Sequence, residues 1–316
     1  MRLLSAPSPG SARPLASVPL RAASATLREL MALRDLQPED PTPARGRRSV
    51  DGPLVRIAAL WRKRKILSLL VRRDLKVRYA DSILGYVWSV LDPLMMAMVY
   101  WFVFATIFSR DVGEEPYLLY LLAGMLPFRW YQSTVTGAAG AIKGERLVRS
   151  TALPREIWIL RLVFSKGAEY LFSLPVLALF IIAYRKGINW EIVYMIPAAL
   201  IQIVLSIGLA LLLSSIGALF RDVDRVMHII MRFMFYATPI IYGLNDVLNN
   251  PKMPEFLKDL YAINPMTGVI TLYRAGLFPS ELHPEMVISS VIGSVVALVV
   301  GWWVFIRLEP AVLKEI

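Results

Sequence analysis

The chain has 316 residues, of which 56% are hydrophobic and 19% charged, a balance too apolar for an ordinary soluble domain of this length. In a soluble protein, a formal net charge of +11 would suggest a nucleic-acid partner. In a membrane protein, the position of the basic residues matters more than their sum. The absence of cysteine excludes disulfides, thiolate metal sites and a cysteine nucleophile. The composition predicts an all-α integral membrane protein with no nucleic-acid partner.

The N-terminal region contains two different segments. Residues 1–54 are rich in Pro, Ser, Ala and Arg and hold no apolar run as long as a signal-peptide core, so we expect a disordered cytosolic extension. Residues 55–85 predict a basic amphipathic helix at the cytosolic membrane interface, interrupted by Leu69, Asp74 and Arg78. Its apolar half is Ile66, Leu67, Leu70, Val71, Leu75 and Val77, and its basic half is Arg72, Arg73 and Lys76.

Two roles remain open for this helix. Its basic residues could attract anionic lipid and act as a topological anchor, or they could bind a lipid substrate that carries phosphate. Gly85 follows the helix and allows the chain to change direction.

Six apolar segments are long enough to cross the roughly 30 Å of membrane hydrocarbon. They are residues 86–108, 117–142, 159–183, 192–219, 226–244 and 287–307, within a six-span domain at 86–308 and before a cytosolic tail at 309–316. With the N-terminus in the cytosol, basic residues are densest in the cytosolic segments, as the positive-inside rule requires. Arg185 and Lys186, in an outer loop, are the exception. Both termini are therefore expected in the cytosol.

Two features interrupt the apolar pattern. Pro93 is expected to kink the first span, and Asp92 is expected to reach the interface or to face protein rather than lipid tails. Residues 245–286 form a long outer connection whose apolar second half is short and contains Pro265 and Arg274. It predicts a re-entrant or interfacial segment between the fifth and sixth spans, with a surface loop of amphipathic helices as the alternative.

Side chains on three spans suggest packing or a substrate path. Small residues recur in the fourth span at Ser206, Ala210, Ser214 and Ala218, which predicts a seam for close helix packing. Aromatic residues share faces of the first and fifth spans, namely Trp101, Phe104 and Phe108, and Phe233 and Tyr236. Such rings anchor proteins in the lipid interface, and they also pack well against the C–H faces of sugars.

Enzyme signatures are missing from the sequence. There is no phosphate loop, no His-Glu-x-x-His and no Gly-x-Ser-x-Gly, and the two histidines, His228 and His283, are predicted on opposite sides of the membrane. We therefore expect a transport protein rather than an enzyme, without a metal or other cofactor of its own.

Four motifs in order carry a family resemblance. They are "RRDLKVRYADSILGYVWSVLDPL" at 72–94, "LVRSTALPREIWILRLV" at 147–163, "FRDVDRVMHIIMRFMFYATPIIY" at 220–242 and "INPMTGVITLYRAGL" at 263–277. Over residues 55–310 the chain resembles the membrane subunit of a type-two ABC exporter of the Wzm type, which moves O-antigen, capsule, teichoic acid or galactan chains. The resemblance implies a bacterial inner-membrane permease for a lipid-linked polysaccharide.

The resemblance also implies partners. Two copies of the permease would pair with two copies of a nucleotide-binding ATPase, which binds ATP and Mg. The matching coupling and contact residues are Arg149, Pro154, Arg155, Glu156, Arg221 and Asp222. The arginines of the first loop would also fit a positive-inside loop without a partner, and Arg221 with Asp222 would also fit an internal ion pair. Aromatic residues would line the channel, and Arg72, Arg73 and Lys76 would receive the lipid pyrophosphate.

Other functions remain as alternatives. An ABC exporter of drugs or small lipids belongs to the same class, and an integral-membrane transferase acting on lipid-phosphate sugars belongs to a different one. A transferase would need convergent carboxylates or histidines in one cavity, whereas the acidic residues here cluster at interfaces and outer loops. Arginine outnumbers lysine, which indicates a GC-rich genome and, with the long N-terminal extension, favours a cell-wall galactan as the polymer.

Overall fold

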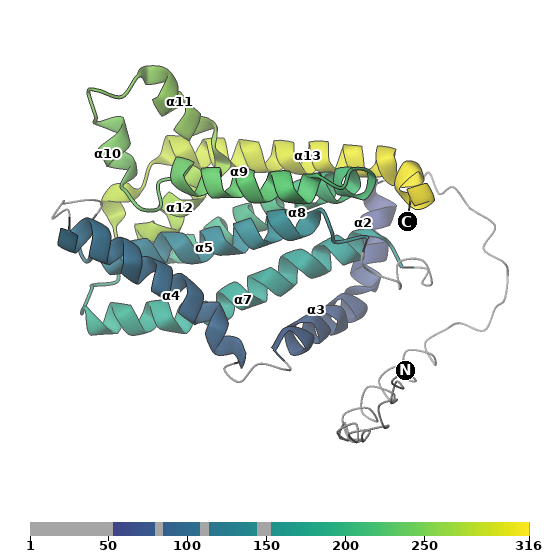
Figure 1. Cartoon of the computed structure of the whole chain (residues 1–316), viewed down its shortest axis with the longest axis horizontal. Helices are drawn as coiled ribbons and strands as arrows, with labels where there is room; N and C mark the ends of the chain where they lie inside the picture. The colour runs from purple at the N-terminus through teal and green to yellow at the C-terminus, as the bar shows by residue number, and fades with distance from the viewer. Residues whose placement is uncertain (1–52, 80–84, 108–113, 144–152, 316) are drawn as a thin grey trace, which may run out of the picture. The chain divides into compact units, whose positions relative to one another are not determined.

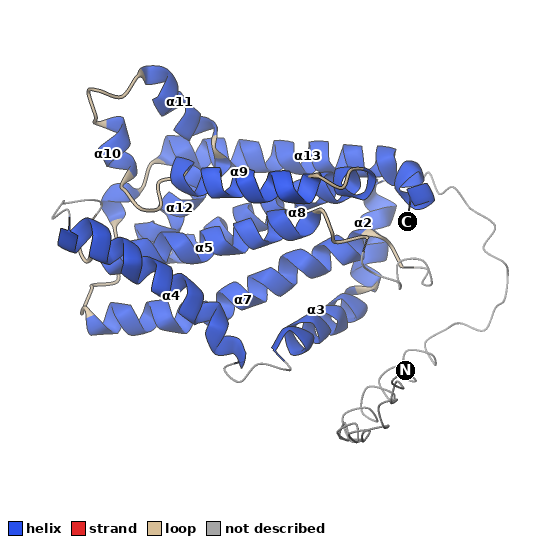
Figure 2. Cartoon of the chain, in the orientation of Figure 1, coloured by secondary structure: helices blue, strands red, loops and turns tan. Residues whose placement is uncertain are grey.

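The computed structural model describes residues 53–79, 85–107, 114–143 and 153–315. Figure 2 shows these residues as helices joined by loops, and no strand occurs among them. The predicted all-α class is therefore confirmed for the described part of the chain. The predicted N-terminal extension, Phe108 and Arg149 lie outside it.

The long helices lie side by side, as Figure 1 shows. They are α4 (Trp88–Trp101, preceded by η1, Gly85–Val87, and followed by the π-helical turn η2, Phe102–Ile107), α5 (Tyr117–Ala138), α7 (Glu156–Ala183), α8 (Met195–Leu219, after η3, Trp190–Tyr194), α9 (Val223–Ala237) and α13 (Pro284–Glu315). Each overlaps one of the predicted spans. We call the end where α7 begins and α13 finishes the α2 end, and the opposite end the α11 end.

Three helices of the described chain are long and apolar enough to cross a membrane. They are Glu156–Ala183, Trp190–Leu219 and Pro284–Val312. The helix over Val90–Phe104 is apolar but shorter. The chain is thus an all-helical protein with several long apolar helices, and six remains the predicted number of spans.

Helices α8 and α13 pack at backbone contact distance. A Cβ added to Gly208 would lie 2.4 Å from the backbone of Ala297, and one added to Gly301 would lie 2.0 Å from the carbonyl oxygen of Gly208. Only glycine permits such an approach, which increases the dispersion contacts between the two helices. The small residues predicted to form a seam on α8 are all buried.

Helix α9 ends earlier than the predicted fifth span. The span was expected to reach residue 244, but the helix ends at Ala237 and Thr238 is extended, with φ −108° and ψ 139°. Pro239 explains the difference, because its ring excludes the helical conformation from the residue before it. The carbonyl groups that follow need partners outside a helix.

The connection between α9 and α13 supplies those partners. It contains α10 (Leu244–Leu248), α11 (Glu255–Ile263), α12 (Pro265–Ala275) and η4 (Pro279–Glu281), gathered at the α11 end in Figure 1. Asn264 caps α12 by accepting a hydrogen bond from the Met266 amide at 3.0 Å. The helix is buried from Met266 to Ala275 and packs on α5, α8 and α13.

Arg274 of α12 is fully buried and joins the end of α9 to α5. Its guanidinium donates to the carbonyl oxygens of Ile240 at 2.6 Å, Pro239 at 2.7 Å and Tyr120 at 3.3 Å. It also lies 3.6 Å from the centre of the Tyr120 ring. The side chain of Arg274 thus donates to the carbonyl oxygens that are left without helical partners where Pro239 ends α9.

The predicted N-terminal helix consists of two helices, α2 (Pro53–Arg62) and α3 (Arg64–Tyr79). Gly85 has a φ of +49°, in the left-handed region that glycine tolerates best, which agrees with the predicted change of direction. Figure 1 shows α2 close to the end of α13.

Candidate functional site

Helix α3 docks along α7 through charged side chains. Asp74 Oδ2 lies 3.0 Å from Nε of Arg161 and 3.4 Å from Oγ of Ser165. One turn further along, Arg78 Nη1 lies 2.5 Å from Oε1 of Glu169. The contacts advance in the same direction on both helices, so α3 and α7 run parallel. Asp74 and Arg78, which interrupt the predicted amphipathic pattern, are the residues that attach the helix.

The predicted basic arc of α3 lies on the side that remains accessible. Arg72 and Lys76 are exposed and four residues apart, so they share a face. Arg73 is half-buried, with Nη2 3.3 Å from Oδ1 of Asp74. Two of the three predicted residues are therefore placed to meet a ligand from outside the chain.

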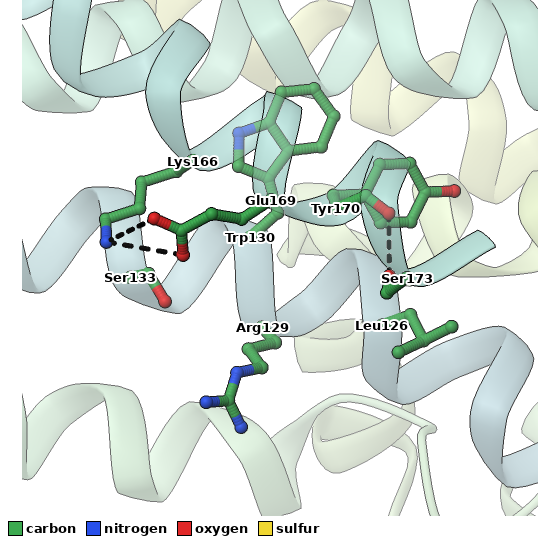
Figure 3. Close-up of a pocket in the computed structure, with 8 residues that line it drawn as sticks. All are labelled: Leu126, Arg129, Trp130, Ser133, Lys166, Glu169, Tyr170 and Ser173. Carbon is green, nitrogen blue, oxygen red and sulfur yellow. Dashed lines mark hydrogen bonds and ion pairs between the residues drawn. The ribbon is translucent and has the colours of Figure 1, made fainter. Parts of the chain in front are cut away.

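A small polar cavity lies between α5 and α7 beside this contact. Figure 3 shows Lys166 and Glu169 side by side on α7, with Nζ of Lys166 3.1 Å from Oε1 of Glu169. Trp130 and Tyr170 stack at 5.4 Å between ring centres and form part of the wall. The cavity measures about 20 Å³, which is room for one water molecule and not for a substrate.

The ion pair of Lys166 and Glu169 was not predicted from the sequence, although the spacing of the two residues indicates it. Two opposite charges three residues apart inside a predicted span indicate residues that face protein rather than lipid. The partner of Glu169 in α3, Arg78, is far away in sequence.

Asp92 lies on the exposed side of α4 and pairs with α5. Its Oδ2 is 2.6 Å from Nη2 of Arg129, and both side chains are about half exposed. Pro93, the next residue, is buried and lies inside the helix. Asp92, expected at the interface or facing protein, is exposed and has Arg129 as its partner.

A larger cavity of about 300 Å³ lies between α4, α5 and α9. Its polar lining residues are Tyr100, Arg129, Gln132, Arg232 and Tyr236, and its apolar ones are Pro93, Met96, Met125, Phe128 and Phe235. The hydroxyl groups of Tyr100 and Tyr236 lie 3.2 Å apart, and the Tyr100 ring stacks on Phe235 with centres 5.7 Å apart. This size suits a small-molecule group, and the lining mixes aromatic faces with cationic donors.

The predicted channel residues divide around this cavity. Tyr236 lines it, whereas Trp101 and Phe233 are exposed elsewhere on their helices. Phe104 is partly buried and lies 6.4 Å from Tyr100, measured between ring centres. Sequence reasoning missed Tyr100 and Phe235 because the helical spacing of one segment does not show which rings of another segment meet it.

At the α2 end, the predicted coupling residues form internal ion pairs. Glu156 is buried, and its Oε1 lies 2.9 Å from Nη1 of Arg56. Arg56 Nη2 also lies 2.9 Å from Oε2 of Glu309, while Arg155 pairs with the other oxygen of Glu309. Burial lowers the pKa of Arg56, but its hydrogen bonds and attraction to Glu309 and Glu156 outweigh this and raise the pKa above its usual value.

The other described residues that were predicted to contact the ATPase are more exposed than Glu156. Pro154 is half-buried just before α7, and Arg221 and Asp222 are exposed at the turn between α8 and α9. No group of three or more His, Asp or Glu side chains able to hold a metal occurs among the described residues.

Comparison with known proteins identifies the family. The model of the ABC-2 type transporter family matches residues 66–278, which include α4, α9, α12 and the cavity between α4, α5 and α9. The chain belongs to the ABC-2 type transporter family. This permease is therefore the membrane subunit of a transporter and has no ATPase domain, as predicted. ABC-2 permeases pair with an ATPase subunit, where the cofactors generally reside.

Several curated relatives resemble the permease over most of its length. The O-antigen export system permease protein RfbA of Klebsiella pneumoniae is 29% identical over 246 residues, which cover 77% of this chain and 92% of the relative. RfbA of Myxococcus xanthus is 29% identical over 239 residues, or 74% of this chain and 90% of the relative. The polysialic acid transport protein KpsM of Escherichia coli is 22% identical over 252 residues, or 78% and 94%.

Proposed function

We propose that the permease exports a lipid-linked cell-surface polysaccharide across the bacterial inner membrane, driven by a separate ATPase. The observation that carries the proposal is the similarity to O-antigen and polysialic acid export proteins over at least 90% of their length. The cavity between α4, α5 and α9 agrees with it, because aromatic faces accommodate sugars. A galactan is our choice for the polymer, on the arginine-rich composition.

In this proposal two copies of the permease associate with two ATPase subunits, and the α2 end faces the cytosol. The exposed apolar side chains of α4 and α9, such as Met95, Val99, Ile229 and Phe233, support a protein or lipid neighbour along that face. A second copy placed there would enclose the cavity. Trp101, Phe104, Phe233 and Tyr236 are then assigned to the polysaccharide path, together with Phe108.

The lipid pyrophosphate is proposed to enter at α3. Arg72 and Lys76 are exposed, and the ion pairs of Asp74 and Arg78 with α7 hold the helix in position beneath them. A rigid support lowers the entropy that ordering the arginine would cost on binding.

Coupling to the ATPase is assigned to the loop before α7 and to the turn at Arg221 and Asp222. Because Arg155 and Glu156 are already paired within the chain, an ATPase that binds them must compete with these pairs. We propose that the pairs hold Pro154 in the orientation that the ATPase recognises, and we assign Arg149 to the same contact from its sequence position alone.

Reconstitution tests the proposed function. The permease is placed in vesicles with its cognate ATPase, and the transfer of a polyprenyl-pyrophosphate galactan across the membrane is measured with ATP. We expect ATP-dependent transfer by the complex and no ATP hydrolysis by the permease alone. Transfer of a short-chain lipid or a drug, with none of the glycan, would refute the polysaccharide assignment.

A further inference from the structure

The cavity between α4, α5 and α9 contains more positive than negative charge. It is lined by the guanidinium groups of Arg129 and Arg232, and Asp92 is 2.6 Å from the first of them. Arg232 makes no hydrogen bond or ion pair with any residue in the described ranges. The contacts of Arg129 with Asp92 use Nη2, so its other nitrogen atoms remain available as donors.

These arginines lie well inside their helices. At 1.5 Å per residue, Arg129 is about 18 Å from Tyr117 along α5, and Arg232 is about 14 Å from Val223 along α9. A cationic side chain at such a depth is costly unless it faces water, protein or a ligand of opposite charge. Arg232 faces a cavity, so the missing counter-charge can come from a ligand.

The exposed surface of α9 leads from the α2 end to this cavity. Arg225, His228, Arg232 and Tyr236 are exposed and are separated by three, four and four residues, so they follow one face of the helix. The basic face is continuous with the cavity at Arg232 and Tyr236. An anion that moves along α9 would therefore meet donors at successive turns.

We infer that Arg129 and Arg232 form an anion site that binds the phosphate group of the lipid-linked substrate during its passage, and that Asp92 is the counter-ion which this group displaces. The inference rests on the proposed function and adds a second phosphate site, separate from α3. Paired guanidinium donors suit phosphate oxygens, and the hydrogen-bonded hydroxyl pair of Tyr100 and Tyr236 leaves one neutral donor for the same ligand. Met96 and Phe128 line the same cavity, and low-dielectric walls beside the arginines strengthen their attraction for an anion.

The role of Asp92 makes the test specific, because two variants should act in opposite directions. The full chain in phosphatidylcholine nanodiscs is titrated with polyprenyl pyrophosphate, and affinity is measured by thermophoresis. Arg232→Gln should weaken binding about tenfold or more, and Arg232→Lys should weaken it less. Asp92→Asn should strengthen binding, because Arg129 loses its competing partner. Unchanged affinity in Arg232→Gln, or weaker binding in Asp92→Asn, would overturn the inference.

Arg307 provides the matched control. It is an exposed arginine on α13, its guanidinium lies 5.3 Å from the centre of the Trp303 ring, and it does not line the cavity. Arg307→Gln removes the same charge and should leave affinity within about twofold of wild type. If Arg307→Gln lost as much affinity as Arg232→Gln, the loss would be explained by net charge alone, and the proposed anion site would also be refuted.

Competition identifies the source of the phosphate. Displacement by inorganic pyrophosphate supports recognition of the headgroup alone, and binding that inorganic pyrophosphate cannot displace supports a site that also requires the prenyl chain. Equal displacement by phosphatidylglycerol would overturn the substrate assignment, because any anionic lipid would then suffice. A complex that exports glycan without binding polyprenyl pyrophosphate at this site would refute the anion site alone. Binding without export would instead count against the proposed function.

Discussion

Replacing Arg274 by Met should destabilise the α11 end of the bundle. The substitution keeps an apolar stem of similar length but removes the donors to Pro239, Ile240 and Tyr120. Two of these bonds are short, at 2.6 Å and 2.7 Å, and their carbonyl oxygens belong to the residues that follow the end of α9. Without Arg274 they lose their donor in a buried region, where water cannot readily replace it.

The magnitude follows from two opposing terms. Hydrogen bonds to a charged group contribute roughly 1.5 to 3 kcal/mol each, and the contact with the Tyr120 ring adds about 2 kcal/mol. Removing the guanidinium also removes the cost of burying its charge. A buried carbonyl oxygen left without a donor costs about 1 to 3 kcal/mol, so losing the two short bonds should cost roughly 2 to 6 kcal/mol, which corresponds to a fall of roughly 10 °C in the thermal midpoint.

The assay is thermal unfolding of the full chain in detergent, followed by tryptophan fluorescence, with size-exclusion chromatography to verify assembly. Gly124→Ala gives an independent perturbation, because its Cβ would lie 2.6 Å from Nη2 of Arg274 and would displace the guanidinium. Arg307→Gln serves as the surface control. A midpoint for Arg274→Met within about 2 °C of wild type would refute the reasoning, since the carbonyl groups would then have found other partners.

Four further predictions concern other parts of the molecule. Changing Arg72 and Arg73 together to Lys should weaken binding of the lipid-pyrophosphate glycan more than binding of anionic lipid at matched charge, because lysine lacks paired donors. Equal losses, measured by titration, would leave α3 as a membrane anchor. Glu309→Gln should lower the thermal midpoint by an amount equivalent to about 2 kcal/mol and reduce coupling to ATP hydrolysis, because both of its arginine partners lose a charged acceptor. Normal coupling in reconstituted complexes would restrict the residue to a packing role. Gly208→Val should prevent assembly on size-exclusion chromatography, since even its Cβ would lie 2.4 Å from the α13 backbone. A monodisperse, stable variant would contradict that close approach. Tyr236→Ala should lower glycan transport per folded complex several-fold, and unchanged transport would remove the ring from the sugar path.

The positions of the long helices could be predicted because the membrane requires a run of about 20 apolar residues, a constraint that acts within each segment. The end of α9 could also have been predicted, since Pro239 restricts the residue before it. The predicted range instead followed hydrophobicity past the proline. Local backbone chemistry overrides an apolar pattern at such a point.

Contacts between distant segments were beyond the sequence pattern. Asp92 was expected at the interface or facing protein, but nothing in its own helix identifies Arg129 as the partner. Arg274 was taken only as a charge that argues against a further span, whereas it donates to the carbonyl oxygens of the residues that follow α9. Burial of a charge depends on which acceptors the fold brings to it, and these acceptors come from residues far along the chain.

The ion pairs at the α2 end also set an order for biosynthesis. Arg56 and Glu309 are separated by 253 residues, so their contact forms only when the final helix has been made. At about 5 to 20 residues per second, the ribosome reaches Glu309 roughly 13 to 50 s after Arg56. Until then Arg56 can pair with Glu156, but neither Arg56 nor Arg155 has Glu309 to bind. A chain truncated before α13 would therefore lack the pairs of Glu309 with Arg56 and Arg155, which would leave this end more accessible to proteases.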